Sequence, residues 1–155
     1  MQNQQQEAFQ RAANLCSRYE KCSGDIFQKL IQWGLTEDEA FPVLDALKEE
    51  KYIDDERFAR SFVRDKFRFN KWGKLKISNH LRAKRVESRL IDEALTEIDE
   101  SDYQDLLERL LKEKNRGLKA GSEQERKAKL FRFAQGRGFE GNLIFEVLSQ
   151  LLARE

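Results

Sequence analysis

Apolar residues recur along this chain every three or four positions, in short segments that turn residues separate. This spacing predicts a series of amphipathic α-helices. The expected helices follow an N-terminal stretch that begins like an exposed helix, and they cover residues 24–33, 37–50, 55–70, 74–84, 88–98, 102–115, 123–136 and 141 onward. The stretch 116–122 is the clearest loop between them.

Polar residues before these segments match the N-cap preference for Ser, Thr and Asp, whose side chains accept a hydrogen bond from the first helical turn. Thr36 and Glu39 have the spacing of a capping box, but Pro42 then falls late in the helix. If Asp38 is the cap instead, Pro42 lies in the first turn, where its missing N–H costs little. The expected caps along the chain are Ser23, Thr36 or Asp38, Asp54, Ser101 and Ser122.

The apolar positions repeat along the chain with shifts of 51 and then 53 residues. The aligned sets are Leu30, Leu35 and Leu44; Leu81, Val86 and Leu95; and Ala134, Phe139 and Leu148, with Ile26, Ile77 and Leu130 in the same register. Three units follow, over 1–50, 51–99 and 100–155, each with one long and two shorter helices. A three-helix unit cannot bury all its apolar surface alone, so neighbouring units should stack. The expected fold is all-α, with three tandem three-helix repeats in an elongated, curved row of right or left hand.

The composition supports this fold class. Of the 155 residues, 37% are charged and 39% hydrophobic, and one is proline, which suits helices with thin cores. Eleven phenylalanines supply much of the core material. No apolar run reaches the length of about 18 residues that a membrane-spanning helix needs. The N-terminus has no apolar signal-peptide core, so a soluble, cytoplasmic protein is expected.

Few residues suited to chemistry are present. Cys16 and Cys22 are the two cysteines and His80 is the one histidine, which is too few for a zinc site. Both thiols are expected to be reduced, with core or surface roles. Phosphate-loop, nucleophile-elbow and metal-ligand patterns are absent, so we expect neither an enzyme nor a cofactor. A capped row of repeats is expected to be a monomer.

Positive charge is concentrated in the middle of the chain. Between Arg57 and Arg85 there are eleven Lys and Arg residues and one acid, a net charge of +10, whereas the whole chain carries +1. On a helical wheel, one arc of roughly 80° holds Arg57, Arg60, Arg64, Arg68 and Lys71. The opposite side holds Phe58, Ala59, Phe62, Val63 and Phe69. Lys66 falls inside this apolar arc, so its stem is expected to be buried and its amine to reach outward.

The next helix extends the pattern. Its inward positions are Ile77 and Leu81, and its cationic face is formed by Lys74, Arg82 and Arg85, with Ser78 between them. Between the two helices, Trp72 is expected to be a packing anchor rather than a stacking platform for bases. Gly73 is expected to allow a tight turn.

This charge distribution favours a functional surface. A solvated helix face usually mixes charges of both signs, because opposite charges four residues apart stabilise a helix. A row of cations without an acid between them loses that stabilisation, and its natural targets are phosphates or an acidic protein surface. The candidate basic face comprises Arg57, Arg60, Arg64, Arg68, Lys71, Lys74, Lys76, Arg82, Lys84 and Arg85.

The charge reverses in the following segment. From Glu87 to Glu113 there are ten acids and three bases, a net charge of −7. Three interpretations stay open: this acidic run holds adjacent repeats together, contacts a basic partner surface, or forms a solvated face.

The segment 54–86 resembles the RecX family of bacterial recombination regulators. The shared pattern begins with an acidic pair and Phe-Ala at the head of a helix, here Asp54, Asp55, Phe58 and Ala59. A Lys-aromatic-Gly turn follows, here Lys71, Trp72 and Gly73, and then an Ile…Leu pair, here Ile77 and Leu81. The family pattern ends in Lys-Gly-Ile/Val, and this chain has Arg85 in place of that Gly. The middle repeat carries nearly all of the resemblance, Gly138–Phe139 adds to it, and the first repeat is the most divergent.

The resemblance implies a non-enzymatic protein that binds the RecA filament on DNA, lies along its helical groove and dampens its activities. Single-stranded DNA would be contacted directly or through RecA, by the basic face of the middle repeat. The alternative is a stand-alone helical module that binds nucleic acid. Helices 74–84 and 88–98 could pass for a helix-turn-helix, but the second contains Asp92, Glu93 and Glu97, which do not suit a recognition helix.

Overall fold

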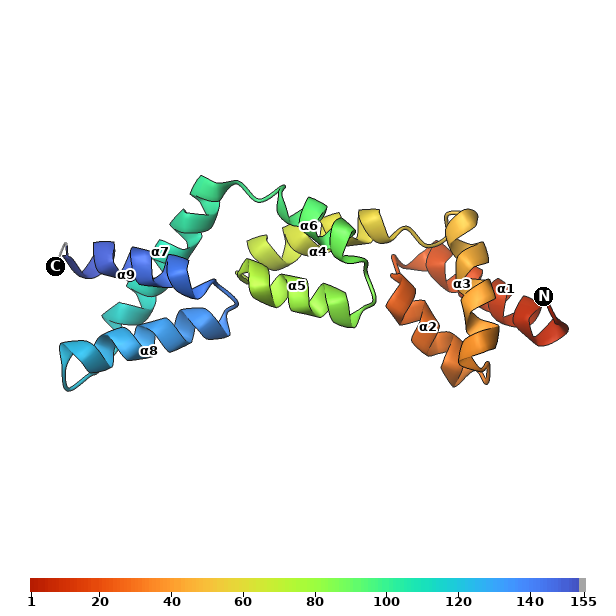
Figure 1. The fold of residues 1–155 in the computed structure, drawn as a ribbon, viewed down its shortest axis with the longest axis horizontal. Helices are drawn as coiled ribbons and strands as arrows, with labels where there is room; N and C mark the ends of the chain where they lie inside the picture. Colours follow the sequence, from red (N-terminus) through yellow and green to blue (C-terminus); the bar gives the residue numbers. More distant parts are fainter. Residues whose placement is uncertain (154–155) are drawn as a thin grey trace. The chain divides into compact units, whose positions relative to one another are not determined.

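The computed structural model describes residues 1–153, and within this range the chain forms nine α-helices and no strand (Figure 1). The helices are α1 Asn3–Arg18, α2 Ser23–Gln32, α3 Glu37–Glu49, α4 Asp55–Arg68, α5 Lys74–Ala83, α6 Ser88–Leu95, α7 Glu100–Arg116, α8 Glu123–Gly136 and α9 Gly141–Ala153. The predicted all-α class is confirmed.

Two compact units divide the chain. The first contains Met1–Ser61 and His80–Ala94, and the second contains Phe62–Asn79 and the chain from Leu95 onward. The division runs through α4 and α5. The predicted repeat boundaries at residues 50 and 99 stay a prediction, and residues 154–155 lie outside the described range.

In the first unit, α1, α2 and α3 pack against one another around an apolar core. Alanines on α1 allow close approach of the helices, and Ile26, Leu30 and Leu47 are fully buried between them. The whole cluster comprises Ala8, Ala12, Ala13, Ile26, Phe27, Leu30, Leu35, Ala40, Val43, Leu44, Leu47 and Ile53. Large side chains with no exposed area stabilise this bundle by about 1.5–3 kcal/mol each.

In the second unit, α7, α8 and α9 form the corresponding bundle. Leu107 and Leu111 from α7, Leu130 from α8 and Ile144 from α9 have no exposed area. Tyr103 and Phe139 extend this core, and their ring centroids are 5.1 Å apart.

The helices α2, α5 and α8 end with the same hydrogen bond, which supports the repeat register. The backbone N–H groups of Leu35, Val86 and Phe139 donate to the carbonyls of Leu30, Leu81 and Ala134, at 3.1, 3.2 and 3.2 Å. The residue before each donor is left-handed, with φ of 99° at Gly34, 64° at Arg85 and 96° at Gly138. This is a Schellman ending, and Arg85 adopts it despite its side chain.

The capping predictions are confirmed at three positions. Thr36 and Glu39 form the capping box of α3, so Pro42 lies inside this helix and the alternative cap Asp38 is wrong. Asp54 accepts from the backbone N–H of Arg57, and Ser122 from that of Glu125, at 3.0 and 3.1 Å.

Two other caps were predicted wrongly. Ser101 does not cap α7, because the helix begins earlier and Asp99 accepts from the backbone N–H of Asp102. Ser23 is the first residue of α2 rather than its cap, and its hydroxyl donates to Asp55 at 2.6 Å. In both cases a carboxylate, rather than the serine that the spacing favoured, accepts from a backbone N–H at the helix start.

Phe69, just after α4, and Ser78, on α5, also depart from the helical wheel. Phe69 was placed on the apolar face but is 76% exposed, because α4 ends at Arg68 and the turn at Lys71, with φ of 57°, brings Trp72 back onto Phe62 instead. The ring centroids of Phe62 and Trp72 are 6.4 Å apart. Ser78 was placed among cations on the outer face, but it is buried.

Within the first unit, the start of α2 meets the turn after α5, and we call this contact the N-terminal seam. The backbone N–H of Gly24 donates to the carbonyl of Lys84 at 3.0 Å, and the Cys22 thiol donates to the same oxygen at 3.7 Å. Asp55 accepts from both the N–H and the hydroxyl of Ser23. A Cβ on Gly24 would lie 2.2 Å from the Lys84 carbonyl oxygen, so only glycine permits this approach.

Within the second unit, the start of α5 meets the turn after α8 in the same way, and we call this contact the C-terminal seam. The N–H groups of Gly73 and Leu75 donate to the carbonyls of Arg137 and Gly138, at 2.7 and 3.0 Å. The hydroxyl of Tyr103 accepts from the N–H of Lys74 at 2.8 Å and donates to Glu140. Gly73 therefore serves the contact with the following repeat as well as the turn.

Candidate functional site

The first unit holds two cations of the predicted stripe, and both contact acids. Nε of Arg57 lies 2.8 Å from Oε1 of Glu20, and Nη1 of Arg57 lies 3.8 Å from Oδ2 of Asp54. Arg60 pairs with Glu56 one turn earlier on α4. No local pattern predicts the Glu20 contact, because that acid lies outside α4 and is brought there by the fold. These two guanidinium groups are therefore already partly neutralised.

Two further cations of the candidate basic face belong to the seams. Nζ of Lys84 lies 3.0 Å from Oδ1 of Asp25 at the N-terminal seam, and Nζ of Lys74 lies 2.7 Å from Oε1 of Glu100 at the C-terminal seam. Burial alone would raise the pKa of Asp25, but hydrogen bonds from Lys84 and Cys22 outweigh it and lower the pKa. The geometry gives these lysines a structural role.

Groups at the seams are also held in their neutral forms. Burial raises the pKa of the Cys22 thiol to about 12, so this thiol stays protonated at neutral pH. Burial and the hydrogen bond to Glu140 raise the pKa of Tyr103 above its ordinary value. The polar atoms of both side chains are hydrogen-bonded, and these hydrogen bonds hold neighbouring helices together. Their roles are therefore structural.

The remaining stripe cations, Arg64, Arg68 and Lys71, lie in the second unit and are exposed. None of the three forms an ion pair within the part of the chain that the structure describes. They are the members of the predicted stripe with charge left for a partner.

These three cations line two adjoining hollows with α7. The larger, of about 620 Å³, is lined by Phe67, Arg68, Lys71, Asp102, Asp105, Leu106, Glu108, Arg109 and Lys112. The smaller, of about 190 Å³, is lined by Val63, Arg64, Phe67, Arg68, Glu97, Ile98, Asp99 and Asp102. Because both hollows include Phe67, Arg68 and Asp102, we treat them as one trough.

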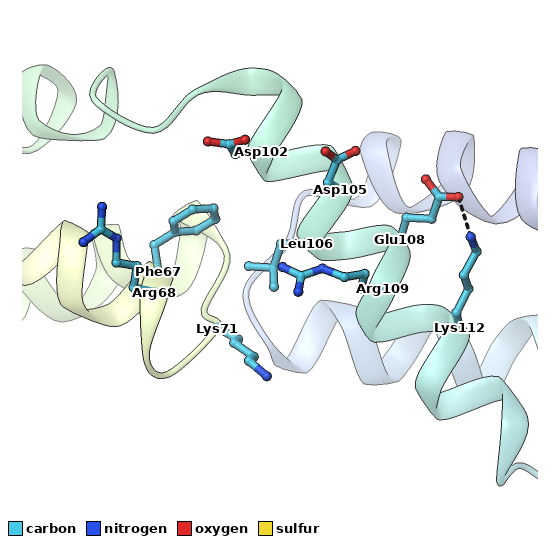
Figure 2. Close-up of a pocket in the computed structure, with 9 residues that line it drawn as sticks. All are labelled: Phe67, Arg68, Lys71, Asp102, Asp105, Leu106, Glu108, Arg109 and Lys112. Carbon is cyan, nitrogen blue, oxygen red and sulfur yellow. Dashed lines mark ion pairs between the residues drawn. The ribbon is translucent and has the colours of Figure 1, made fainter.

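The trough has walls of opposite charge. Figure 2 shows Arg68 and Lys71 projecting from the end of α4 and the turn that follows, and Asp102 and Asp105 on the first turns of α7. Phe67 and Leu106 supply apolar surface between the walls. Farther along α7, Arg109 adds a cation to the acidic wall, and Glu108 is paired with Lys112 at 3.1 Å. The acidic run of the sequence thus faces part of the basic stripe across a gap.

Aromatic rings contact members of the candidate basic face and also Lys66, which lies outside it. The ammonium groups of Lys66 and Lys76 lie 5.0 and 4.7 Å from the centroid of the Trp72 ring. Trp72 is half-buried, which fits the predicted packing anchor. In the first unit, the guanidinium of Arg85 lies 4.0 Å from the centroid of the Phe27 ring, and Arg82 is exposed. Such contacts of about 0.5–2 kcal/mol orient the cations without neutralising them.

The sequence did not identify Phe67, Asp102 and Asp105 as neighbours of the basic stripe. These acids were assigned to a separate run, and no local signal links residues 64–71 to residues 97–112. The contact depends on how α7 packs in the second unit.

The cysteines and the histidine are the remaining residues of chemical interest in the described range. Cys16 and Cys22 are both free thiols, and His80 lies on an exposed helix position. No group of three or more His, Cys, Asp and Glu side chains within residues 1–153 is arranged to hold a metal ion. None of the helices in this range has the length and apolar character that crossing a membrane requires.

Comparison with known proteins gives one consistent result. The family model described as "RecX, second three-helix domain" matches residues 54–95, and "RecX, third three-helix domain" matches residues 100–148. A "Regulatory protein RecX" of Vibrio campbellii is 32% identical over 138 residues, which cover 89% of this chain and 87% of that protein. A protein of the same name from a Mycobacterium species (strain JLS) is 29% identical over 99% of this chain and 86% of its own length.

Solved structures agree with the sequence relatives. A crystal structure titled as regulatory protein RecX superposes with a TM-score of 0.84 at 26% identity, over 95% of this chain and 72% of that one. The structure of RecX from Lactobacillus salivarius superposes with a TM-score of 0.82 at 18% identity, over 96% and 97% of the two chains, and shows the shared fold. The predicted tandem three-helix architecture is therefore confirmed.

Proposed function

Since this chain belongs to the RecX family of regulatory proteins, we propose that it binds the filament that the RecA recombinase forms on single-stranded DNA and dampens its activities. In this role the protein is a cytoplasmic, monomeric and non-enzymatic regulator of recombination and DNA repair, including the SOS response. It needs no cofactor, because its effect comes from binding energy alone.

The exposed cations of the second unit are the observation that carries this proposal. Arg64, Arg68 and Lys71 keep their charge available, whereas Arg57, Arg60, Lys74 and Lys84 are paired with acids of the chain itself. Of the ten residues in the candidate basic face, we expect the first three to contribute most to binding. Lys76, Arg82 and Arg85 lie outside these pairs and contribute secondarily.

The proposal is tested with the triple variant Arg64→Gln, Arg68→Gln and Lys71→Gln. Glutamine keeps the helix propensity and much of the side-chain length, so the fold is expected to survive. We expect weaker binding to RecA filaments on single-stranded DNA and weaker inhibition of their ATP hydrolysis, by about tenfold or more.

A matched control removes three cations elsewhere in the second unit. Arg116→Gln, Lys119→Gln and Lys127→Gln change the net charge equally at exposed positions outside the trough. Full inhibition by the first triple variant, or equal losses in both variants, would contradict the assigned surface. Tight binding to DNA without RecA, with steep salt dependence, would instead favour the stand-alone nucleic-acid module.

A further inference from the structure

We propose that the trough between α4 and α7 binds a segment of a partner protein that has acidic side chains along one edge, basic side chains along the other and apolar side chains between. The proposal rests on the proposed function, in which this segment belongs to a RecA subunit. It assigns the trough to protein rather than to the phosphate backbone of DNA.

The two walls face each other without neutralising each other. The cationic wall consists of Arg64, Arg68 and Lys71, which form no ion pair in the described part of the chain. Across the hollows, Asp102 and Asp105 are exposed carboxylates of α7. Because the two walls do not pair with each other, the charges of both are available to a partner. A partner segment that carries both signs can pair with both walls at once.

The floor of the trough supports the same kind of partner. Phe67 and Leu106 line it with apolar surface (Figure 2), and Val63 and Ile98 extend this surface in the smaller hollow. Leu106 and Ile98 are largely buried. An apolar floor gives a side chain a place to be removed from water, and the rim charges then set its register. A sugar-phosphate backbone has no apolar side chain to bury against such a floor.

The acidic wall disfavours nucleic acid at this place. Phosphates bound to Arg68 would lie beside Asp102, since both residues line both hollows. The smaller hollow adds Asp99 and Glu97, and the larger adds Asp105. Farther along the larger hollow, Glu108 is paired with Lys112, and Arg109 is a cation on the same wall. The carboxylates near Arg68 repel a phosphate, so part of the gain from the cationic wall is offset. Any contact with DNA is left to cations outside the trough, such as Lys76 and Arg85.

The two kinds of occupant predict opposite effects for one variant. Asp102→Asn with Asp105→Asn removes two negative charges with little change of shape. If the occupant is a segment of mixed charge, its basic edge loses its partners and binding to the RecA filament weakens, on the order of tenfold. If the occupant is a phosphate backbone, repulsion is relieved and binding strengthens.

The experiment measures the affinity of each variant for RecA filaments on single-stranded DNA and for the same DNA alone. We expect Asp102→Asn/Asp105→Asn and Arg68→Gln/Lys71→Gln to lose affinity for filaments to similar extents. The control Glu113→Gln/Glu146→Gln removes two exposed acids of the second unit outside the trough and should bind normally. Tighter binding by the Asp102/Asp105 variant, or an unchanged affinity, would overturn the proposal, and thermal unfolding checks that each variant is folded.

A second measurement keeps this test separate from the proposed function. A short helical peptide with Glu along one edge, Lys along the other and Leu between is titrated into the isotopically labelled protein, beside matched peptides whose charges are all Glu or all Lys. We expect the mixed peptide to shift amide signals of residues 64–71 and 97–109 most strongly. Stronger binding of a single-sign peptide would refute the trough assignment. Failure of the wild type to bind RecA filaments would refute the proposed function, while the peptides still decide what the trough accepts.

Discussion

The two seams of this protein join equivalent helices, but they use different hydrogen bonds. At the N-terminal seam one backbone N–H, that of Gly24, donates to the carbonyl of Lys84 in the turn after α5. At the C-terminal seam two N–H groups at the start of α5 donate to carbonyls in the turn after α8. At the N-terminal seam, the carboxylate of Asp55 accepts from Ser23. At the C-terminal seam, the buried phenol of Tyr103 accepts from Lys74 and donates to Glu140.

The difference shows which part of the contact is fixed and which part varies. The backbone hydrogen bonds require glycine where chains approach closely, at Gly24 in one seam and at Gly73 and Gly138 in the other. The side-chain acceptor only needs to reach the exposed N–H groups of a helix start, which a carboxylate or a hydroxyl can do. The two acids of the family pattern therefore have different roles. Asp54 caps its own helix, and Asp55 caps a helix of the preceding repeat.

The largest expected difference between the seams concerns their glycines. In Gly138→Ala the new Cβ would lie 2.3 Å from Cβ of Lys76 and the residue has φ of 96°, so overpacking and left-handed strain add up to about 3 kcal/mol or more. Gly24→Ala meets a carbonyl at 2.2 Å without that φ and should cost less. Urea unfolding measures both changes.

Gly136→Ala is the control for this prediction, because a Cβ there has no atom within 4 Å and it ends α8. It should stabilise the protein slightly, by about 0.4–1 kcal/mol. A Gly138→Ala protein as stable as wild type would show that the C-terminal seam is looser than its contacts indicate.

A smaller difference should separate the two side-chain acceptors. Asp55→Ala removes two hydrogen bonds to a carboxylate and should destabilise the N-terminal seam by about 2 kcal/mol. In a Cys16→Ala background, alkylation of the buried Cys22 then reports opening of this seam, and its rate should rise roughly 5- to 30-fold.

Tyr103→Phe is the matched change at the C-terminal seam. It should lower the free energy of unfolding by about 1–2 kcal/mol, because the N–H of Lys74 and the carboxylate of Glu140 lose their partner. The rate of Cys22 alkylation should stay at its wild-type value. Equal acceleration in both variants would mean that the seams open together rather than separately.

The smallest expected effect concerns the two seam lysines. Lys84→Gln and Lys74→Gln each remove a partly exposed ion pair, worth less than about 1 kcal/mol. Because the pKa of Asp25 is lowered in the folded state, the contribution of Lys84 is present above the ordinary carboxyl pKa of 3.8 and is lost as the pH falls below it. Urea unfolding from neutral to acid pH should therefore show the difference between Lys84→Gln and wild type disappearing.

Much of the fold was predictable because its signals are local. Apolar spacing located the helices, and the register that joins Leu30, Leu81 and Ala134 identified three similar helix endings. The predicted caps Ser23 and Ser101 are wrong for different reasons. At Ser23 the tertiary structure brings in Asp55 as the acceptor, and at Ser101 the helix starts earlier, so that Asp99 is the cap. Phe69 was misjudged because a wheel assumes that a helix continues, and α4 ends at Arg68.

The candidate site was predicted only in part. A row of cations is visible in the sequence, but the charge that each one keeps depends on neighbours that are distant in the chain. Glu20 forms an ion pair with Arg57, and Glu100 forms one with Lys74. Asp102 and Asp105 meet the remaining cations only across the trough.

The sequence by itself determined the helical class, the threefold repeat and the family, because these depend on periodic burial and on short motifs. The tertiary structure decided which cations are free, which glycines are indispensable and what lies opposite the basic stripe. The physical reason is the range of the interactions. Helix formation and capping act over three or four residues, whereas ion pairing, close backbone contact and the trough depend on segments that only folding brings together.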